Sequence, residues 1–187
     1  GVAKVLAMNK FTSSGVRILF QPAEEIAQGA NWMKAENALE GLNSLFGVHV
    51  YPDLSVGKIG IKSGTFTAAA GELEIDIIGN GGHGARPHEA VDSIWIAAKV
   101  VSGLQEAISR SLDALNPVVI SFGKVSGGNA FNVIAEKVKL LGTVRCLDSD
   151  LYKKLPEWIE QIVSNIASTY GAKAIVNFRS IAPPVYN

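Results

Sequence analysis

The second half of the chain carries a regular alternation of apolar and polar residues. Leu73, Ile75 and Ile77 alternate with acidic residues, which predicts a strand with one buried and one solvated face. Three further strands are predicted over residues 117–125, which Pro117 opens and a turn at residues 127–129 follows, 138–146 and 174–178.

Two predicted helices lie between these strands. The first begins after Asp92, a residue type that caps helix N-termini, and ends near residue 110. The second begins at Asp148 or Ser149 and ends at Gly171, which suits a helix C-cap. The order strand, helix, strand, strand, helix, strand is typical of the ferredoxin-like fold, with both helices on one face of a mostly antiparallel sheet.

The first part of the chain has continuous apolar runs instead of an alternation. The apolar run after a turn at residues 12–15 predicts a buried strand over residues 16–20, and further buried strands are predicted over residues 44–50 and 56–61. A helix is predicted over residues 26–35, and residues 1–8 resemble the end of another helix. Alternating strands and helices indicate an α/β architecture, and the small residues at 63–71 predict a domain boundary.

Composition narrows the classes of partner. The chain has 17 basic and 17 acidic residues, which argues against a nucleic-acid partner. No apolar run is long enough to span a bilayer, so we expect no membrane partner. The single cysteine cannot form a disulfide within the chain, which favours a reducing, cytoplasmic location.

Two adjacent carboxylates, Glu24 and Glu25, follow the predicted strand at residues 16–20. Ligands of α/β proteins usually bind at the carboxyl ends of strands. Two close carboxylates ionise together when a divalent cation neutralises them, so one could bind the cation and the other act as a base. The pair also fits the acidic first turn of a solvated helix, and the residues alone favour that second interpretation.

The three histidines lie in turns or at strand ends. His49 falls in the apolar run at residues 44–50, where its ring nitrogens need a partner, either a metal ion or a backbone carbonyl. His83 and His88 belong to the glycine-rich segment at residues 79–88, whose tight backbone would hold an exposed imidazole. This segment matches neither a dinucleotide-binding nor a phosphate-binding loop, and a flexible hairpin turn is the alternative.

Arg145 lies on a predicted strand, on the face opposite Val144 and Cys146, and Asn132 precedes that strand in the chain. An arginine near asparagines can hold a carboxylate through a bidentate pair, although an ordinary surface salt bridge is equally compatible with the pattern. Cys146 has no neighbouring histidine in the sequence, so we interpret it as a small buried hydrophobe instead of a nucleophile.

Taken together, these motifs resemble the M20 metallopeptidase family, especially its branch of aminoacylases, hippurate hydrolases and auxin-conjugate hydrolases. The matching segments are residues 20–25 (FQPAEE), 46–50 (FGVHV), 81–83 with 87–88 (GGH and PH), and 129–132 with 142–145 (NAFN and GTVR). Four motifs in the family's order are far more specific than any one of them.

The resemblance implies a role for each candidate residue. Glu24 matches the general base, and Glu25 and His49 match metal ligands. His83 matches a histidine of the lid domain that reaches the active site of the partner subunit and stabilises the oxyanion. Asn132 and Arg145 match groups that orient the substrate and bind its α-carboxylate.

The resemblance also implies a domain organisation. Residues 1–68 would belong to a zinc-peptidase-like catalytic domain, residues 69–180 to an inserted ferredoxin-like lid that dimerises, and residues 181–187 to the return into the catalytic domain. The family's upstream Cys-Gly-His-Asp motif and its downstream histidine ligand have no counterpart in the chain. We therefore expect a central fragment that is inactive by itself.

The function implied is metal-dependent hydrolysis of the amide bond of N-acyl amino acids, which releases a carboxylic acid and a free amino acid. The implied cofactors are two divalent metal ions, zinc or manganese, with cobalt and nickel as alternatives. The implied partner is a second copy, bound through the lid as a homodimer. Competing hypotheses are a related M20 exopeptidase or desuccinylase, and a non-catalytic dimerisation or binding module.

Overall fold

The computed structural model describes residues 1–9 and 15–187. Contacts within the chain divide it into two compact units, a first unit of Gly1–Lys58 and a second unit of Ile59–Asn187. Each unit is described by itself below. The assignment of residues 1–68, 69–180 and 181–187 to parts of a catalytic domain and a lid stays a prediction.

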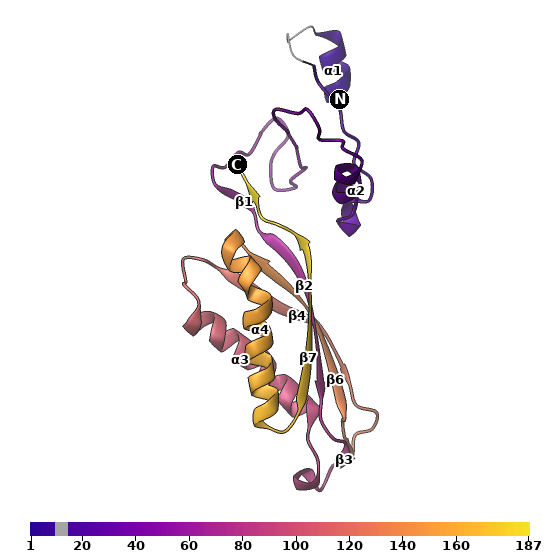
Figure 1. Ribbon diagram of the computed structural model, residues 1–187, viewed down its shortest axis with the longest axis vertical. Helices are drawn as coiled ribbons and strands as arrows, with labels where there is room; N and C mark the ends of the chain where they lie inside the picture. The colour runs from indigo at the N-terminus through magenta and orange to yellow at the C-terminus, as the bar shows by residue number, and fades with distance from the viewer. Residues whose placement is uncertain (10–14) are drawn as a thin grey trace. The chain divides into compact units, whose positions relative to one another are not determined.

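A four-stranded antiparallel sheet forms the centre of the second unit (Figure 1). Its strands in spatial order are β4 (Val118–Gly127), β6 (Lys137–Cys146), β2 (Ala69–Ile78) and β7 (Lys173–Ala182). All four predicted strands are therefore present. Because the first and third strands of the motif pair at the centre, the order is that of the predicted ferredoxin-like fold.

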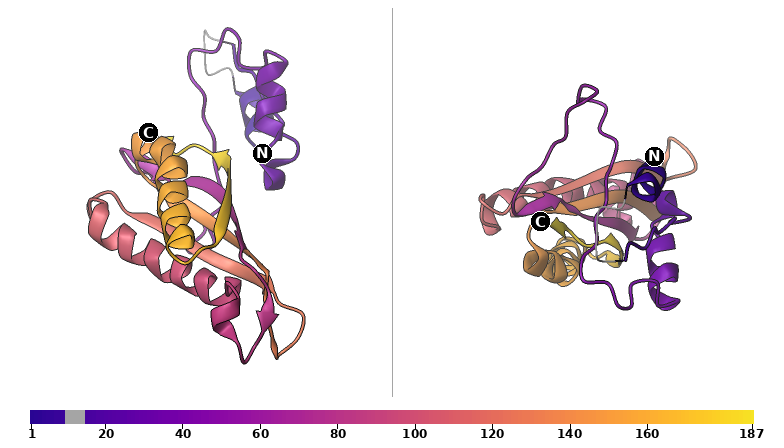
Figure 2. Two further views of the ribbon diagram at one scale, coloured as in Figure 1. Left: turned by 60° about the horizontal axis from the view of Figure 1, so that its bottom comes forward. Right: turned by 90° about the horizontal axis from the view of Figure 1, so that it is seen from above.

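Two long helices, α3 (Ser93–Ser111) and α4 (Ser149–Thr169), cover one face of this sheet (Figures 1 and 2). Asp92 caps α3 by accepting hydrogen bonds from the backbone amides of Ile94 and Trp95. Asp148 caps α4 by accepting one from the amide of Leu151. The cap residues predicted from the sequence therefore set both helix starts.

The core lies between the helices and the inner sheet face. Leu73, Leu140 and Leu155 are fully or almost fully buried there, at 0–1% exposure, as are the apolar faces of both helices. Burying a side chain of this size contributes about 2 kcal/mol relative to leaving it in water. The alternation along β2 is explained by this one-sided burial, since every second side chain enters the core.

The other sheet face is charged. Its cross-strand ion pairs are Lys137–Asp76 and Lys139–Glu74, each at 2.8 Å, and Arg179–Glu72. The hydrogen bond to Glu74 raises the pKa of Lys139. Opposite charges on neighbouring strands stabilise the pairing register, and they suit this face to water instead of an apolar partner.

Two short ladders lie beyond the two ends of the long strand β2 (Figure 1). One pairs β1 (Thr65–Thr67) with β8 (Val185–Tyr186), and the other pairs β3 (Gly82–His83) with β5 (Val133–Ile134). Neither ladder was predicted, because segments of two or three residues are too short to show a period.

The first unit contains little regular structure. Its elements are α1 (Val2–Met8), the 3-10 turn η1 (Glu24–Ile26) and α2 (Gly29–Ala35). The helix predicted at residues 26–35 is thus shorter and follows a separate turn. Most of the turn predicted at residues 12–15 lies outside the described residues.

The buried strands predicted at residues 16–20, 44–50 and 56–61 are wrong for this structure, where these segments form no ladder. Phe46 is 92% exposed and Val48 is 95% exposed. A buried strand needs neighbouring strands for its backbone groups, and an apolar run does not specify them. No helix of the described part of the chain combines the length and apolar character needed to cross a bilayer.

Candidate functional site

His83 lies at the end of β3, where its backbone pairs with Val133 of β5. A tight turn follows, closed by a 2.8 Å hydrogen bond from the amide of Arg86 to the carbonyl of His83. The Nδ1 atom of His83 accepts a hydrogen bond from the backbone amide of Ala85 at 3.1 Å. The imidazole is therefore exposed yet held at one nitrogen, as the glycine-rich segment predicted.

Asn132 lies directly across from this turn. The amide of Gly84 donates to the carbonyl of Asn132 at 2.8 Å. A Cβ atom at position 84 would lie only 2.8 Å from that carbonyl oxygen, so this close approach requires glycine. The structure thus brings together two of the candidate site residues, His83 and Asn132, which are far apart in the sequence.

Arg145 lies at the other end of the sheet. On β6 it is eight positions from Lys137, about 26 Å at roughly 3.3 Å per residue. The ladder that holds His83 lies beyond Lys137, since the amide of Gly79 already donates to Glu136. Within one chain the structure therefore does not bring Arg145 together with His83.

The side chain of Arg145 is exposed while Val144 and Cys146 beside it are buried, as the alternation predicted. Its Nη1 donates to the hydroxyl of Thr143 at 2.6 Å and to the carbonyl of Val144 at 3.0 Å. The guanidinium has five N–H donors, so these two contacts orient the group and leave donors for a carboxylate.

Glu24 and Glu25 form the first turn of η1, with exposed side chains. The flanking residues Ala23 and Ala27 adopt left-handed backbone conformations, with φ of 50° and 53°. Such conformations cost energy for residues other than glycine. The turn places the two carboxylates at adjacent positions, and the prediction that one is a base and the other a ligand stays open.

His49 was predicted in a buried strand, and this is wrong for the structure, where it lies in exposed irregular backbone. Its Nδ1 lies 2.6 Å from the carbonyl oxygen of Val50. Because a carbonyl only accepts, Nδ1 must carry the proton, and the lone pair is then on Nε2. This tautomer suits a metal ligand, although the backbone carbonyl is the partner that the structure shows.

The predicted metal ligands do not form a complete centre. Across residues 1–9 and 15–187, no three histidine, cysteine, aspartate or glutamate side chains are close enough to hold one ion. A divalent ion such as zinc takes at least four ligands, several from protein side chains. Glu25 and His49 alone therefore do not fit a two-metal site.

The remaining candidates have simple structural explanations. Cys146 is 1% exposed, and desolvation raises the pKa of its thiol, as expected for a small buried hydrophobe. His88 is exposed, with its Nε2 3.7 Å from a carboxylate oxygen of Glu89. Neither residue has the surroundings of an activated nucleophile or base.

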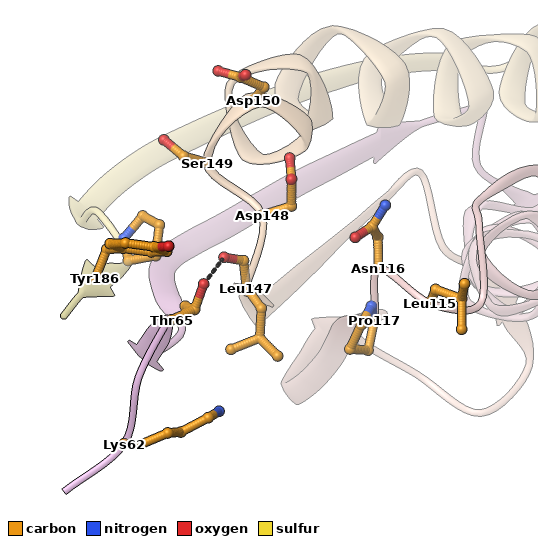
Figure 3. A pocket seen from close by; sticks show the side chains of 11 residues that line it. Lys62, Thr65, Leu115, Asn116, Pro117, Leu147, Asp148, Ser149, Asp150 and Tyr186 are labelled. Atoms are coloured by element: carbon orange, nitrogen blue, oxygen red, sulfur yellow. Dashed lines mark hydrogen bonds between the residues drawn. The ribbon is translucent and has the colours of Figure 1, made fainter.

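A hollow of about 600 Å³ lies beside the start of α4 (Figure 3). Among its lining residues, Asp148 caps the helix, and Thr65 donates a 3.3 Å hydrogen bond to the carbonyl of Leu147. None of the six predicted site residues lines it. Two of its polar side chains, Thr65 and Asp148, thus support the local fold.

Comparison with known proteins identifies the family to which the chain belongs. The family model described as a peptidase dimerisation domain of the M20 type matches residues 63–171, more than half of the chain. The chain belongs to the M20 peptidase family. The matched region contains the turn at His83, the strand that carries Arg145 and most of the ferredoxin-like fold.

Three similar proteins illustrate the relationship. A probable hydrolase of Synechocystis sp. is 53% identical over the entire chain, and an N-acyl-L-amino acid amidohydrolase of Geobacillus stearothermophilus is 40% identical. The chain spans about half the length of these relatives, 48% and 51%. A Bacillus subtilis structure, described as a dinuclear metal-binding M20 peptidase, superposes with a TM-score of 0.72 at 34% identity, covering 90% of this chain and 41% of that one.

The close approach at Gly84 generates a testable prediction. In Gly84→Ala the new Cβ meets the backbone of Asn132, so we expect β3 and β5 to separate, at a cost of about 1–3 kcal/mol. Amide hydrogen exchange at residue 84 measures this local opening. Gly123→Ala is the matched control, because nothing lies within 4 Å of its Cβ position. Equal protection in both variants would contradict the structure.

Proposed function

We propose that the protein containing this chain hydrolyses the amide bond of N-acyl amino acids with the help of two divalent metal ions. The observation that carries the proposal is the 40% identity, over the entire chain, to an N-acyl-L-amino acid amidohydrolase. The candidate residues support it, since the chain carries a carboxylate pair, a histidine donor and an exposed arginine, which are the groups that this reaction needs.

Glu25 and His49 would be ligands that this chain contributes to the metal centre. The free Nε2 lone pair of His49 supports that role, and a similar structure is described as dinuclear. Divalent ions bound there would lower the pKa of a water molecule toward neutral pH and polarise the carbonyl of the substrate. The other ligands would come from outside the described residues, and we propose zinc or manganese as the metal.

Glu24 would be the general base. It lies next to the proposed ligand Glu25 in an exposed turn, so its carboxylate can accept a proton from the attacking water. The same carboxyl group would then deliver the proton to the leaving amine. An amide nitrogen leaves readily only after it is protonated, so the proton that Glu24 takes from water is the one that the leaving amine needs.

His83 and Arg145 would bind opposite ends of the substrate. With Nδ1 accepting from Ala85, the Nε2–H of His83 can donate to the oxyanion that forms on the amide carbonyl. Arg145 would bind the α-carboxylate through a bidentate pair, which favours N-acyl amino acids over internal peptide bonds. Asn132, held beside His83, would orient the acyl group.

The sheet separates these two groups by more than the length of one substrate. Arg145 lies near one end of β6, about 26 Å from Lys137 at the other end, and His83 lies beyond Lys137. One substrate cannot contact both in a single chain. We therefore propose a homodimer in which each active site uses His83 of one subunit and Arg145 of the other.

The outer edge of β4 is the proposed dimer surface. β4 is a terminal strand of the sheet and lies within the segment matched as a dimerisation domain, whereas the other terminal strand, β7, lies outside it. Two apolar side chains of β4, Val119 and Val125, are 52% and 63% exposed. An edge strand with free backbone groups can pair with a second copy.

We also propose a cytoplasmic location for the protein. The proposal rests on the single cysteine of this chain, Cys146, which is buried as a free thiol, because free thiols persist in reducing compartments.

Glu24→Gln tests the proposed reaction in the longest natural protein that contains this chain. Loss of a general base lowers kcat about 10²–10⁴-fold, so we expect hydrolysis of N-acetyl and N-benzoyl amino acids to fall by that factor. A chelator should abolish it, and added metal should restore it. Glu36→Gln, which changes another exposed glutamate of the first unit, is the matched control. Full activity in Glu24→Gln, or turnover that ignores the chelator, would contradict the proposal.

Val125→Lys tests the dimer surface. A charge at this exposed position of β4 would be desolvated by a second copy, so we expect the dimer dissociation constant to rise at least roughly tenfold. Analytical ultracentrifugation measures it. Ile175→Lys, on the opposite edge strand β7 and 39% exposed, is the control that should leave the dimer intact. Loss of the dimer only in the Ile175 variant would place the interface on β7.

A further inference from the structure

In the turn after β3, three consecutive backbone amides donate hydrogen bonds to three different acceptors. The amide of Gly84 donates to the carbonyl of Asn132, and that of Arg86 donates to the carbonyl of His83. These two bonds fix the backbone of the turn. The middle amide, that of Ala85, donates instead to the Nδ1 atom of the His83 side chain at 3.1 Å.

This third bond determines which nitrogen of His83 carries the proton. An N–H group can donate only to a nitrogen with a free lone pair, so Nδ1 is unprotonated and the neutral ring carries its proton on Nε2. A proton on Nδ1 would place two donors against each other. The Nε2 atom has no hydrogen-bond partner within residues 1–9 and 15–187.

His49 shows the opposite arrangement. Its Nδ1 faces the carbonyl oxygen of Val50 at 2.6 Å, so there Nδ1 carries the proton and Nε2 offers a lone pair. The two histidines thus present different chemistry at the same ring atom, and in each case a neighbouring backbone group selects the tautomer.

We infer that the backbone amide of Ala85 is a positioning group that holds His83 as an Nε2–H donor aimed at the substrate. The inference deepens the proposed function and rests on it for the identity of the acceptor, the amide oxyanion. Residue 85 acts through its backbone amide, so the identity of its side chain does not reveal this role in the sequence. The tautomer itself does not depend on catalysis and can be measured separately.

Nitrogen-15 NMR of the uniformly labelled chain is the first test. We expect the Nδ1 resonance of His83 in the unprotonated range, a proton on Nε2, and a scalar coupling across the hydrogen bond between the amide nitrogen of Ala85 and Nδ1. His88, whose Nδ1 has no such contact in the described structure, is the internal reference. A protonated Nδ1 on neutral His83 would overturn the inference without any variant.

Replacement of Ala85 by L-lactic acid, its ester analogue, is the second test. The exchange removes one N–H and keeps the methyl group, so we expect the His83 tautomer ratio to shift roughly two- to tenfold toward Nδ1–H, as the loss of one hydrogen bond predicts. The same replacement at Ala90 is the matched control, because its amide donates to the Pro87 carbonyl in the same loop and does not touch His83. An unchanged ratio in the Ala85 ester, or equal shifts in both esters, would overturn the inference.

The role of Ala85 in catalysis is tested by measuring kcat and KM of the longest natural protein that contains the chain. There the Ala85 ester should lower kcat roughly two- to tenfold with little change in KM, whereas the Ala90 ester should not. An active protein whose kcat ignores the Ala85 ester would overturn the positioning role. A protein that is inactive in every form, yet shows the expected tautomer shift, would refute the proposed function and not the hydrogen bond.

Discussion

The antiparallel register between β2 and β6 determines where every candidate residue of the second unit lies. It pairs Ala69 with Cys146 at one end and Ile78 with Lys137 at the other. If either strand slipped by one residue, its own buried and charged side chains would exchange faces while those of its partner stayed in place. Because this register is fixed by the core and by the ion pairs on the open face, Arg145 is held at one end of the sheet while the His83 turn extends from the other.

The second unit could be predicted from the sequence because its signals are local. One buried sheet face gives alternation, and aspartate caps and a terminal glycine mark the helices, so the predicted strands, helices and fold order are confirmed. The juxtaposition of His83 and Asn132 could not be read directly, since it depends on a two-residue ladder and on a backbone contact at Gly84. The positioning amide of Ala85 leaves no trace in the side-chain pattern.

The first unit was predicted less well, for a physical reason. Apolar runs such as residues 44–50 report that a segment is suited to burial, but they do not name the strands that would pair with it. In the structure these segments form no ladder, and His49 is exposed instead of buried. The proposed ligands Glu25 and His49 accordingly do not form a metal centre among the described residues, and their roles rest on the family relationship.

We propose that one reaction uses His83 and Arg145 from different subunits, and a mixture of two inactive variants can test this. His83→Ala and Arg145→Ala, in the longest natural protein that contains the chain, should each be inactive and still dimerise. After subunit exchange, half of the dimers are mixed and each has one intact site, so we expect roughly a quarter of the original activity. If mixed dimers demonstrably form and no activity returns, both residues serve the active site of one subunit and the shared site is wrong.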